Sequence, residues 1–216
     1  FGLSTSGALR SNLRGRLTSQ QNQGNGFVQN RFLNIDDSNA YKEKNLRGML
    51  DWQTSDSLSF KFNLIHFNSE NGYDAWSLDG NRDTESDQPG ENKNKLYATS
   101  ISSIWSINSN YELTTSYSLN DNNNNYAYDA DWVNNSFCNS DSACTAFDFD
   151  QASESFVRDT KQNVLDVRLN SVNEKLVAGF YAKKINEDLV YQYNSAFFGN
   201  FASNSNYSAK RYALYG

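Results

Sequence analysis

The sequence predicts an all-β chain that forms an antiparallel, up-and-down transmembrane β-barrel. Three observations support this fold class. Apolar and polar residues alternate with period two along successive runs. Short polar turns alternate with very long polar segments. Aromatic residues flank the first two short turns on the apolar parity, namely Trp52, Trp105 and Tyr111, and we expect them at the membrane interface.

The first predicted hairpin joins residues 46–52 to residues 58–64 through a turn at 54–57. Arg47, Asp51 and Lys61 lie on the polar parity of these runs. The apolar parity carries Leu46, Leu50, Trp52, Leu58, Phe60, Phe62 and Leu64.

The second predicted hairpin joins residues 97–107 to residues 111–119 through a turn at 108–110. Only Ile104 breaks the polar side of the first run. In the second run the alternation is complete: Tyr111, Leu113, Thr115, Tyr117 and Leu119 oppose Glu112, Thr114, Ser116, Ser118 and Asn120.

A third hairpin is predicted from residues 165–169 to residues 176–182, through a turn at 171–174. The sequence does not decide which face of 176–182 is the apolar one, because two sets of alternating residues are nearly equally apolar. The first set is Leu176, Ala178, Phe180 and Ala182, and the second is Val177, Gly179 and Tyr181. Runs at 13–17 and 212–214 bring the total to about eight strands. Runs of roughly 9–11 residues fit a bilayer.

Long polar segments lie at about 19–44, 69–95, 121–160 and 190–206. Compact soluble domains rarely carry such loops, whereas outer-membrane barrels combine long extracellular loops with short periplasmic turns. Because lipid offers the backbone no hydrogen bonds, the strands must pair in a closed ring.

Composition is compatible with this prediction. The 216 residues have a mean hydropathy of -0.76 and a single proline, Pro89. A barrel strand needs apolar residues only at alternate positions. The longest apolar stretches, such as 176–182, are far too short for a spanning helix. No segment has the pattern of a signal peptide, and the chain starts at Phe1, so we expect a processed protein or a fragment.

The formal net charge of -6 is concentrated in two segments. Residues 69–95 hold seven acids and three bases, and residues 121–160 hold eight acids and one base. The negative charge therefore lies in the predicted loops. Nucleic acid is excluded as a partner, because binding to phosphates needs a basic face.

The two cysteines, Cys138 and Cys144, lie in the second acidic segment with five residues between them. No histidine is near, which argues against a zinc site. We expect a local disulfide and hence an oxidising compartment. The alternative is a pair of free thiols.

Several segments resemble one family in their order along the chain. NGYDAWSLD at 71–79, SDQPG at 86–90 and YAYDADW at 126–132 are similar to outer loops of TonB-dependent receptor barrels. GFVQN at 26–30, LRGMLDW at 46–52 and VAGFY at 177–181 also fit that family.

The resemblance implies a plugged barrel of about 22 strands. Residues 1–216 would then be an internal part of the barrel domain, without the plug and the C-terminal strands. The whole receptor would lie in the outer membrane of a Gram-negative bacterium, in contact with its lipid. It would import a scarce ligand such as a ferric siderophore, with cobalamin or a glycan as options. An inner-membrane energy-coupling complex would drive entry through the plug.

Two other functions stay open. One is a complete eight-stranded outer-membrane barrel with a structural or adhesion role, which would pair the strand near Leu13 with that near Leu214. The other is a secreted carbohydrate-binding β-sandwich, which would bury Trp52 and the leucines between two sheets.

Five aromatic residues are candidates for contact with a ligand in the extracellular vestibule, because aromatic rings offer a large amphipathic area. The alternative is that they pack against neighbouring loops or mark the outer interface. They are Tyr73, Trp76, Tyr126, Tyr128 and Trp132.

Charged residues give weaker candidates. Two acidic sets have the oxygen ligands that Ca²⁺ prefers, but a solvated acidic loop explains them better, and we expect no metal or other cofactor. Inward-facing bases would contact an anionic substrate or the plug, or else pair with Asp51, Glu112 or Asp166. The acids are Asp121, Asp129, Asp131 and Asp141, and Asp79, Asp83 and Asp87; the bases are Arg14, Arg16, Arg47, Lys61 and Arg168.

We expect no enzyme activity. The only histidine, His66, lies on the apolar parity near the outer end of a strand, where an interface residue is expected. No serine lies in a nucleophile-elbow pattern, and no glycine-rich phosphate loop is present.

Overall fold

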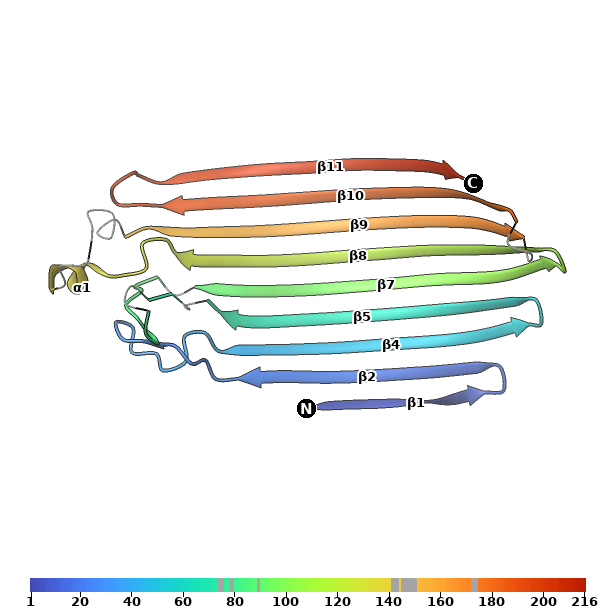
Figure 1. Cartoon of the computed structure of the whole chain (residues 1–216), viewed down its shortest axis with the longest axis horizontal. Helices are drawn as coiled ribbons and strands as arrows, with labels where there is room; N and C mark the ends of the chain where they lie inside the picture. The colour runs from blue at the N-terminus through green and yellow to red at the C-terminus, as the bar shows by residue number, and fades with distance from the viewer. Residues whose placement is uncertain (74–75, 78–79, 89, 141–143, 145–150, 172–174) are drawn as a thin grey trace.

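The computed structural model describes residues 1–73, 76–77, 80–88, 90–140, 144, 151–171 and 175–216. Nine of its strands form one antiparallel sheet in chain order (Figure 1). They are β1 (Gly2–Arg10), β2 (Leu13–Gly24), β4 (Tyr41–Ser55), β5 (Leu58–Gly72), β7 (Glu91–Asn108), β8 (Tyr111–Asp129), β9 (Ser153–Ser171), β10 (Val177–Asn194) and β11 (Phe201–Tyr215). The predicted all-β, up-and-down architecture is confirmed.

The sheet is open in this chain. Strands β1 and β11 form its two edges, and no pairing between them is present among the described residues. A closed eight-stranded barrel is therefore not formed. A sandwich is not formed either, because the only other sheet in the described part of the chain is the two-residue pair β3 (Gln29–Asn30) and β6 (Asp83–Thr84).

The register confirms the alternation that the sequence predicts. Directly opposite residues of an antiparallel pair share a face, so one row crosses all nine strands. That row contains Gly7, Gly15, Leu50, Phe62, Ile101, Tyr117, Leu165, Ala182 and Tyr212. We call this face outward and the opposite face inward. In the third hairpin, Phe180 lies opposite Val167, so the outward set there is Ala178, Phe180 and Ala182.

The outward residues have no protein partner layer. None of Leu50, Phe60, Ile101 and Leu113 is buried, and the exposed fractions of Leu50 and Ile101 are 40% and 38%. A sheet with such a face needs an apolar medium. On β7 the outward residues from Tyr97 to Ile107 span ten residues, about 33 Å along the strand and about 25 Å at a tilt of 40°. We call this zone the apolar band, and its height matches that of outer-membrane barrels.

The short turns lie at one end of the strands and the long connections at the other (Figure 1). The pairing between strands shifts register beside three short turns, at Ala8/Arg10, Gln53/Ser55 and Ser106/Asn108, as β-bulges do at sheet edges. In the turn after β7, the Asn108 side chain accepts hydrogen bonds from the backbone of Asn110 and Tyr111, at 2.8 and 3.1 Å. The predicted turn at 171–174 lies mostly outside the described residues.

The structure corrects the predicted lengths. The sheet has nine strands rather than about eight, because β1 also pairs with β2. The strands that follow β1 in the large sheet contain 12 to 19 residues instead of roughly 9–11. The predicted loops shorten accordingly, to residues 25–40, 73–90, 130–152 and 195–200. The strands continue beyond the apolar band because polar residues on both faces still pair through the backbone.

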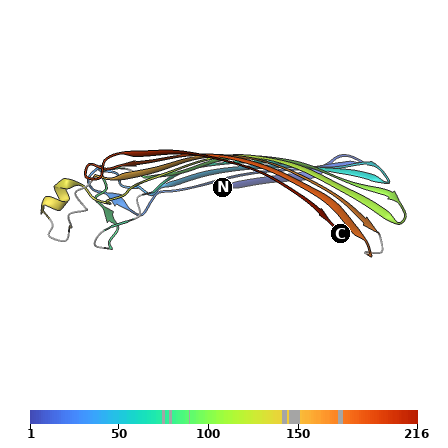
Figure 2. The ribbon, with the colours of Figure 1, turned by 90° about the horizontal axis from the view of Figure 1, so that it is seen from above.

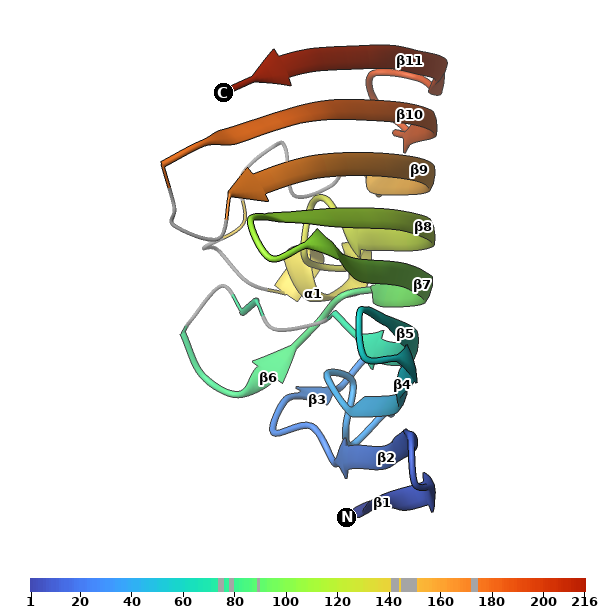
Figure 3. The same cartoon turned by 90° about the vertical axis from the view of Figure 1, so that its right-hand side faces the viewer.

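The small protein core lies in these connections and not on the sheet. The buried apolar residues of the described ranges are Val28, Val133, Cys138 and Ala152. Across the loops, the Asn30 side chain donates to Ser86 O at 2.8 Å, and the Asn134 side chain donates to Glu85 O at 2.7 Å. The bowed sheet carries the loops, with helix α1 (Asn135–Ser140), on its concave side (Figures 2 and 3). No described helix is long and apolar enough to cross a membrane.

Candidate functional site

Aromatic side chains line the inward face of β8 to β11 beyond the apolar band. Tyr126 lies directly opposite Phe156, and Phe156 lies directly opposite Tyr191. The ring centroids are 6.1 Å apart in the first pair and 4.8 Å in the second. Phe201 continues the row at 6.0 Å from Tyr191. Strand pairing therefore fixes four rings in a line across four strands.

The loops bring further rings to the same place. Tyr73 meets Tyr126 edge to face at 5.0 Å, and Trp132 stacks on Tyr128 at 5.7 Å with planes 19° apart. Trp76 lies 5.7 Å from Trp132. The five aromatics that the sequence predicts as ligand contacts thus lie in one cluster with three more. We call this set the vestibule aromatics: Tyr73, Trp76, Tyr126, Tyr128, Trp132, Phe156, Tyr191 and Phe201.

The vestibule aromatics are only partly covered. Trp76 and Phe201 remain 53% and 57% exposed, and the other six are half-buried. Edge-to-face and offset contacts of this kind stabilise the rings against one another while leaving ring faces accessible. The arrangement can therefore accept an organic ligand that presents flat or apolar surface.

Trp132 has an unusual backbone conformation. Its φ of 68° lies in the left-handed region, which bulky residues rarely adopt, at a cost of roughly 1–3 kcal/mol. The Asp129 carboxylate holds this turn by accepting hydrogen bonds from the backbone N–H of Asp131 and Trp132, at 3.2 and 3.1 Å. In this conformation the indole ring of Trp132 stacks on Tyr128.

Asp129 also joins two loops. Its other oxygen accepts hydrogen bonds from the Ser86 hydroxyl at 2.6 Å and from the backbone N–H of Asp87 and Gln88, at 3.1 and 3.4 Å. The residue is 1% exposed, at the extracellular end of β8. Five donors therefore occupy this carboxylate, and we assign it a structural role.

Asp131 lies beside Asp129 and is also buried. Burial, a hydrogen bond with Asp129 and the Asp129 charge raise the pKa of Asp131 to about 8. Two backbone donors act against this rise, from Gln151 at 2.9 Å and Ala152 at 3.1 Å. Burial and Asp129 also raise the pKa of Asp87. The loops therefore hold one acid, Asp131, whose charge depends on pH near neutrality.

Of the acids considered for Ca²⁺, Asp87, Asp129 and Asp131 lie close together, but backbone and hydroxyl donors occupy the Asp129 carboxylate and the others lie elsewhere. Asp121 faces outward and lies 3.9 Å from Lys161, and Asp83 forms an ion pair with Arg31. Asp79 and Asp141 lie outside the described residues. Within the described ranges, no three histidine, cysteine or acidic side chains form a group that could hold a metal ion.

The inward bases mostly have partners. Lys61 lies 3.7 Å from Asp51, and Arg168 lies 3.6 Å from Asp166. Arg47 donates to Asn45 at 3.3 Å. Arg14 lies directly opposite Asp51, and no ion pair with Glu112 is present in the described part of the chain.

Other predicted residues lie away from the vestibule. Trp52, Trp105 and Tyr111 are outward-facing and exposed near the short turns. His66 stacks on Tyr97 with ring centroids 4.3 Å apart, on the outward face at the extracellular limit of the apolar band. The sulfurs of Cys138 and Cys144 form a disulfide in the connection after β8.

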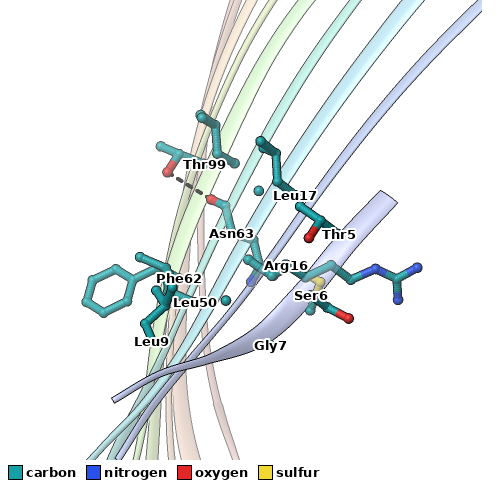
Figure 4. A pocket seen from close by; sticks show the side chains of 14 residues that line it. Thr5, Ser6, Gly7, Leu9, Arg16, Leu17, Leu50, Phe62, Asn63 and Thr99 are labelled. Carbon is teal, nitrogen blue, oxygen red and sulfur yellow. Dashed lines mark hydrogen bonds between the residues drawn. The ribbon is translucent and has the colours of Figure 1, made fainter. Parts of the chain in front are cut away.

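A separate hollow of about 550 Å³ lies on the outward face near β1 (Figure 4). Three glycines without side chains, Gly7, Gly15 and Gly48, contribute to it, and Leu17 and Leu50 lie beside it. Because this face is the lipid-exposed one, the hollow is part of the membrane contact and not of the vestibule.

Comparison with known proteins agrees with this geometry. No protein-family profile and no curated protein matches the sequence. The chain is similar to the solved ferric yersiniabactin uptake receptor FyuA from Yersinia pestis, with a TM-score of 0.77 and 13% identity over 99% of this chain and 32% of that one. It has the fold of an outer-membrane receptor barrel wall.

Two other solved structures match with lower TM-scores. The outer membrane transporter YddB from Escherichia coli gives 0.49, with 15% identity over 99% of this chain and 30% of that one. The siderophore receptor PirA from Pseudomonas aeruginosa gives 0.37, with 14% identity over 96% and 35%. The chain thus spans about a third of the length of the structures that it matches.

Proposed function

We propose that residues 1–216 form part of the barrel domain of a TonB-dependent receptor in a Gram-negative outer membrane. The receptor binds a scarce small ligand at the vestibule aromatics, and a ferric siderophore is the leading candidate. One observation carries this proposal: eight aromatic side chains gather on the inward face of a lipid-exposed sheet, at the end that bears the long loops. The similarity to FyuA supports it at the level of the fold.

The chemistry of the vestibule fits recognition and not catalysis. Ligand sites are mostly apolar and aromatic, with a few polar groups that fix orientation. Glu154 supplies such a polar group, because it lies directly opposite Tyr128 and Tyr193. In this proposal no bond is made or broken; a plug in the rest of the receptor couples release of the ligand to the inner-membrane energy complex.

A neutral glycan is the second candidate ligand. Arg158, which follows Phe156 on the inward face of β9, is tied to Glu187 at 3.5 Å. The charged groups beside the vestibule aromatics are therefore Arg158, whose charge is balanced by Glu187, and the Glu154 carboxylate. Sugar rings stack on aromatic faces without needing a positive charge, whereas an anionic siderophore gains from one.

The test is binding by the full-length protein in detergent, with ⁵⁵Fe-loaded hydroxamate and catecholate siderophores and with neutral oligosaccharides as probes. We expect Tyr126→Leu and Tyr128→Leu to weaken binding of the preferred probe at least tenfold. Tyr117→Leu is the matched control, because Tyr117 lies on the same strand but faces outward. In cells, a protonophore should abolish uptake and leave binding at the surface intact.

The outcomes separate the candidates. Tight binding of a siderophore that is lost only in the inward variants supports the leading proposal, and the same result with an oligosaccharide supports the second. Equal effects of Tyr117→Leu and Tyr126→Leu would contradict a vestibule site for either ligand.

A further inference from the structure

One carboxylate lies among the vestibule aromatics. Glu154 lies near the start of β9, directly opposite Tyr128 on β8 and Tyr193 on β10, so these side chains share the inward face. Two residues further along β9, the ring of Phe156 lies in the next inward row, with its centroid 4.8 Å from that of Tyr191. Glu154 is half-buried. The aromatic site therefore contains an acid whose position is fixed by strand pairing.

Two tyrosine hydroxyls orient the Glu154 side chain. Those of Tyr128 and Tyr191 both donate hydrogen bonds to its carboxylate. Burial and this hydrogen bond raise the pKa of Tyr128, and burial and the Glu154 charge raise the pKa of Tyr191, so both hydroxyls keep their protons at neutral pH. An ionised carboxylate has about four acceptor positions, and two donors leave about half of them to a ligand.

The Glu154 charge has no basic partner in the described part of the chain, where none of the ion pairs includes it. Arg158, the next base along β9, lies four residues away, about 13 Å along the strand, and pairs with Glu187 at 3.5 Å. Residues 69–95 and 121–160, which contain the loops around this site, hold seven and eight acids against three bases and one. Such an excess of one charge attracts ligands of the opposite charge.

These surroundings select an organic cation. A protonated amine donates charge-assisted hydrogen bonds to a carboxylate, and the faces of aromatic rings attract a positive charge within about 6 Å of their centroids. An anionic group would instead meet the like charge of Glu154. A metal ion is not favoured, because no three histidine, cysteine or acidic side chains within the described ranges form a group that could hold one.

We propose that Glu154 and the rings around it bind a protonated amine of the imported ligand. The ammonium group donates hydrogen bonds to the Glu154 carboxylate, and its carbon substituents pack on Phe156 and Tyr191. This inference rests on the proposed function, because it concerns the same vestibule, and it names the class of ligand as an organic cation. A ferric siderophore fits when it carries a free amine, whereas a neutral glycan leaves the Glu154 charge without a partner.

The experiment measures binding to the full-length protein in detergent with two pairs of probes, each pair differing by one charge. The first pair is a ⁵⁵Fe-loaded linear trihydroxamate that ends in a primary amine, and the same chelate with this amine acetylated. The second pair is 2-phenylethylammonium and 2-phenylethanol, followed by ligand-observed NMR. The second pair tests recognition of the cation without assuming that the natural ligand is a siderophore.

The variant is Glu154→Gln, which keeps the shape of the side chain and an acceptor for the tyrosine hydroxyls but removes the charge. The matched control is Asp159→Asn. It removes the same charge from the same strand, but Asp159 faces outward, directly opposite Asn123 and Asp188. Heat-modifiable gel mobility shows that each variant is folded.

We expect the wild type to bind each amine about tenfold more tightly than its uncharged counterpart, the gain typical of one charge-assisted hydrogen bond. Glu154→Gln should abolish this preference, and Asp159→Asn should change it by less than about twofold. Should Glu154→Gln fail to fold, the comparison within each pair on the wild type still decides.

The outcomes separate this inference from the proposed function. Equal and tight binding of the chelate with and without its amine would overturn the inference and leave the receptor proposal standing. A preference for 2-phenylethylammonium without binding of either chelate would support the inference and contradict the siderophore. Equal effects of Glu154→Gln and Asp159→Asn would overturn the inference, because they would show attraction by the overall charge and not by a site.

Discussion

A charge placed on the outward face should test directly whether this face contacts lipid. Ile101 lies four residues from Tyr97 and six from Ile107 on β7, about 13 and about 20 Å along the strand from the two limits of the apolar band, and so close to its middle. A lysine at the bilayer midplane costs roughly 2–4 kcal/mol on a barrel strand. We therefore expect Ile101→Lys to shift the unfolding equilibrium by about 30- to 900-fold.

The matched control is Ser100→Lys, the inward neighbour on the same strand. Its expected cost is about 1 kcal/mol, from loss of the hydrogen bond that the Asn63 side chain donates to Ser100 at 3.0 Å. Both variants of the full-length protein are unfolded with urea from phospholipid vesicles and followed by tryptophan fluorescence. A cost below 1 kcal/mol for Ile101→Lys, or equal costs for both variants, would refute the lipid contact.

Three further predictions concern the extracellular loops. Because the pKa of Asp131 is raised in the fold, the folded loops bind more protons than the unfolded ones between about pH 4 and 8. The stability of the loops should therefore fall as the pH rises through this window. The measurement is amide hydrogen exchange at Ala152, which should become faster after division by the intrinsic exchange rate at each pH. Asp131→Asn should make this corrected rate nearly independent of pH. Asp129→Ala leaves five donors without their acceptor, so limited proteolysis in residues 83–88 and 130–134 should accelerate while the barrel band on a gel is unchanged. Replacing Cys138 and Cys144 by serine should loosen only this connection, by about 2 kcal/mol for so short a loop, with no change in urea unfolding of the sheet.

The sequence predicted the sheet because the bilayer imposes a strict pattern on it. Most outward positions in the apolar band are apolar or aromatic, with Thr99, Ser103 and Thr115 as the small polar exceptions on β7 and β8. The alternation around Phe62, Ile101 and Tyr117 therefore revealed the strands, and the cross-strand register follows the same parity. The edge strand β1, with the sequence GLSTSGALR, was missed because glycine and serine weaken its alternation.

Beyond the apolar band this constraint disappears. Both faces of the extended strands meet polar surroundings, so a run such as Asn122–Asn125 gives no periodic signal although it pairs fully with β9. The partners Phe156, Tyr191 and Phe201 were missed for the same reason. These three residues lie in the parts of β9, β10 and β11 beyond Lys161, Lys184 and Lys210. Only when those parts are known to be strands can the three side chains be assigned to the inward face.

The strand extensions change where recognition is placed. From Leu119 to Asp129, β8 runs ten residues past the apolar band, about 33 Å, and it carries Tyr126 and Tyr128 on its inward face. A continuous ladder of backbone hydrogen bonds holds these rings, whereas loops alone would leave them to move independently. Tyr73, Trp76 and Trp132 come from the connections, and the buried Asp129 carboxylate fixes one of those connections to the end of β8. Strand pairing therefore positions one half of the vestibule aromatics, and contacts between the connections position the other half.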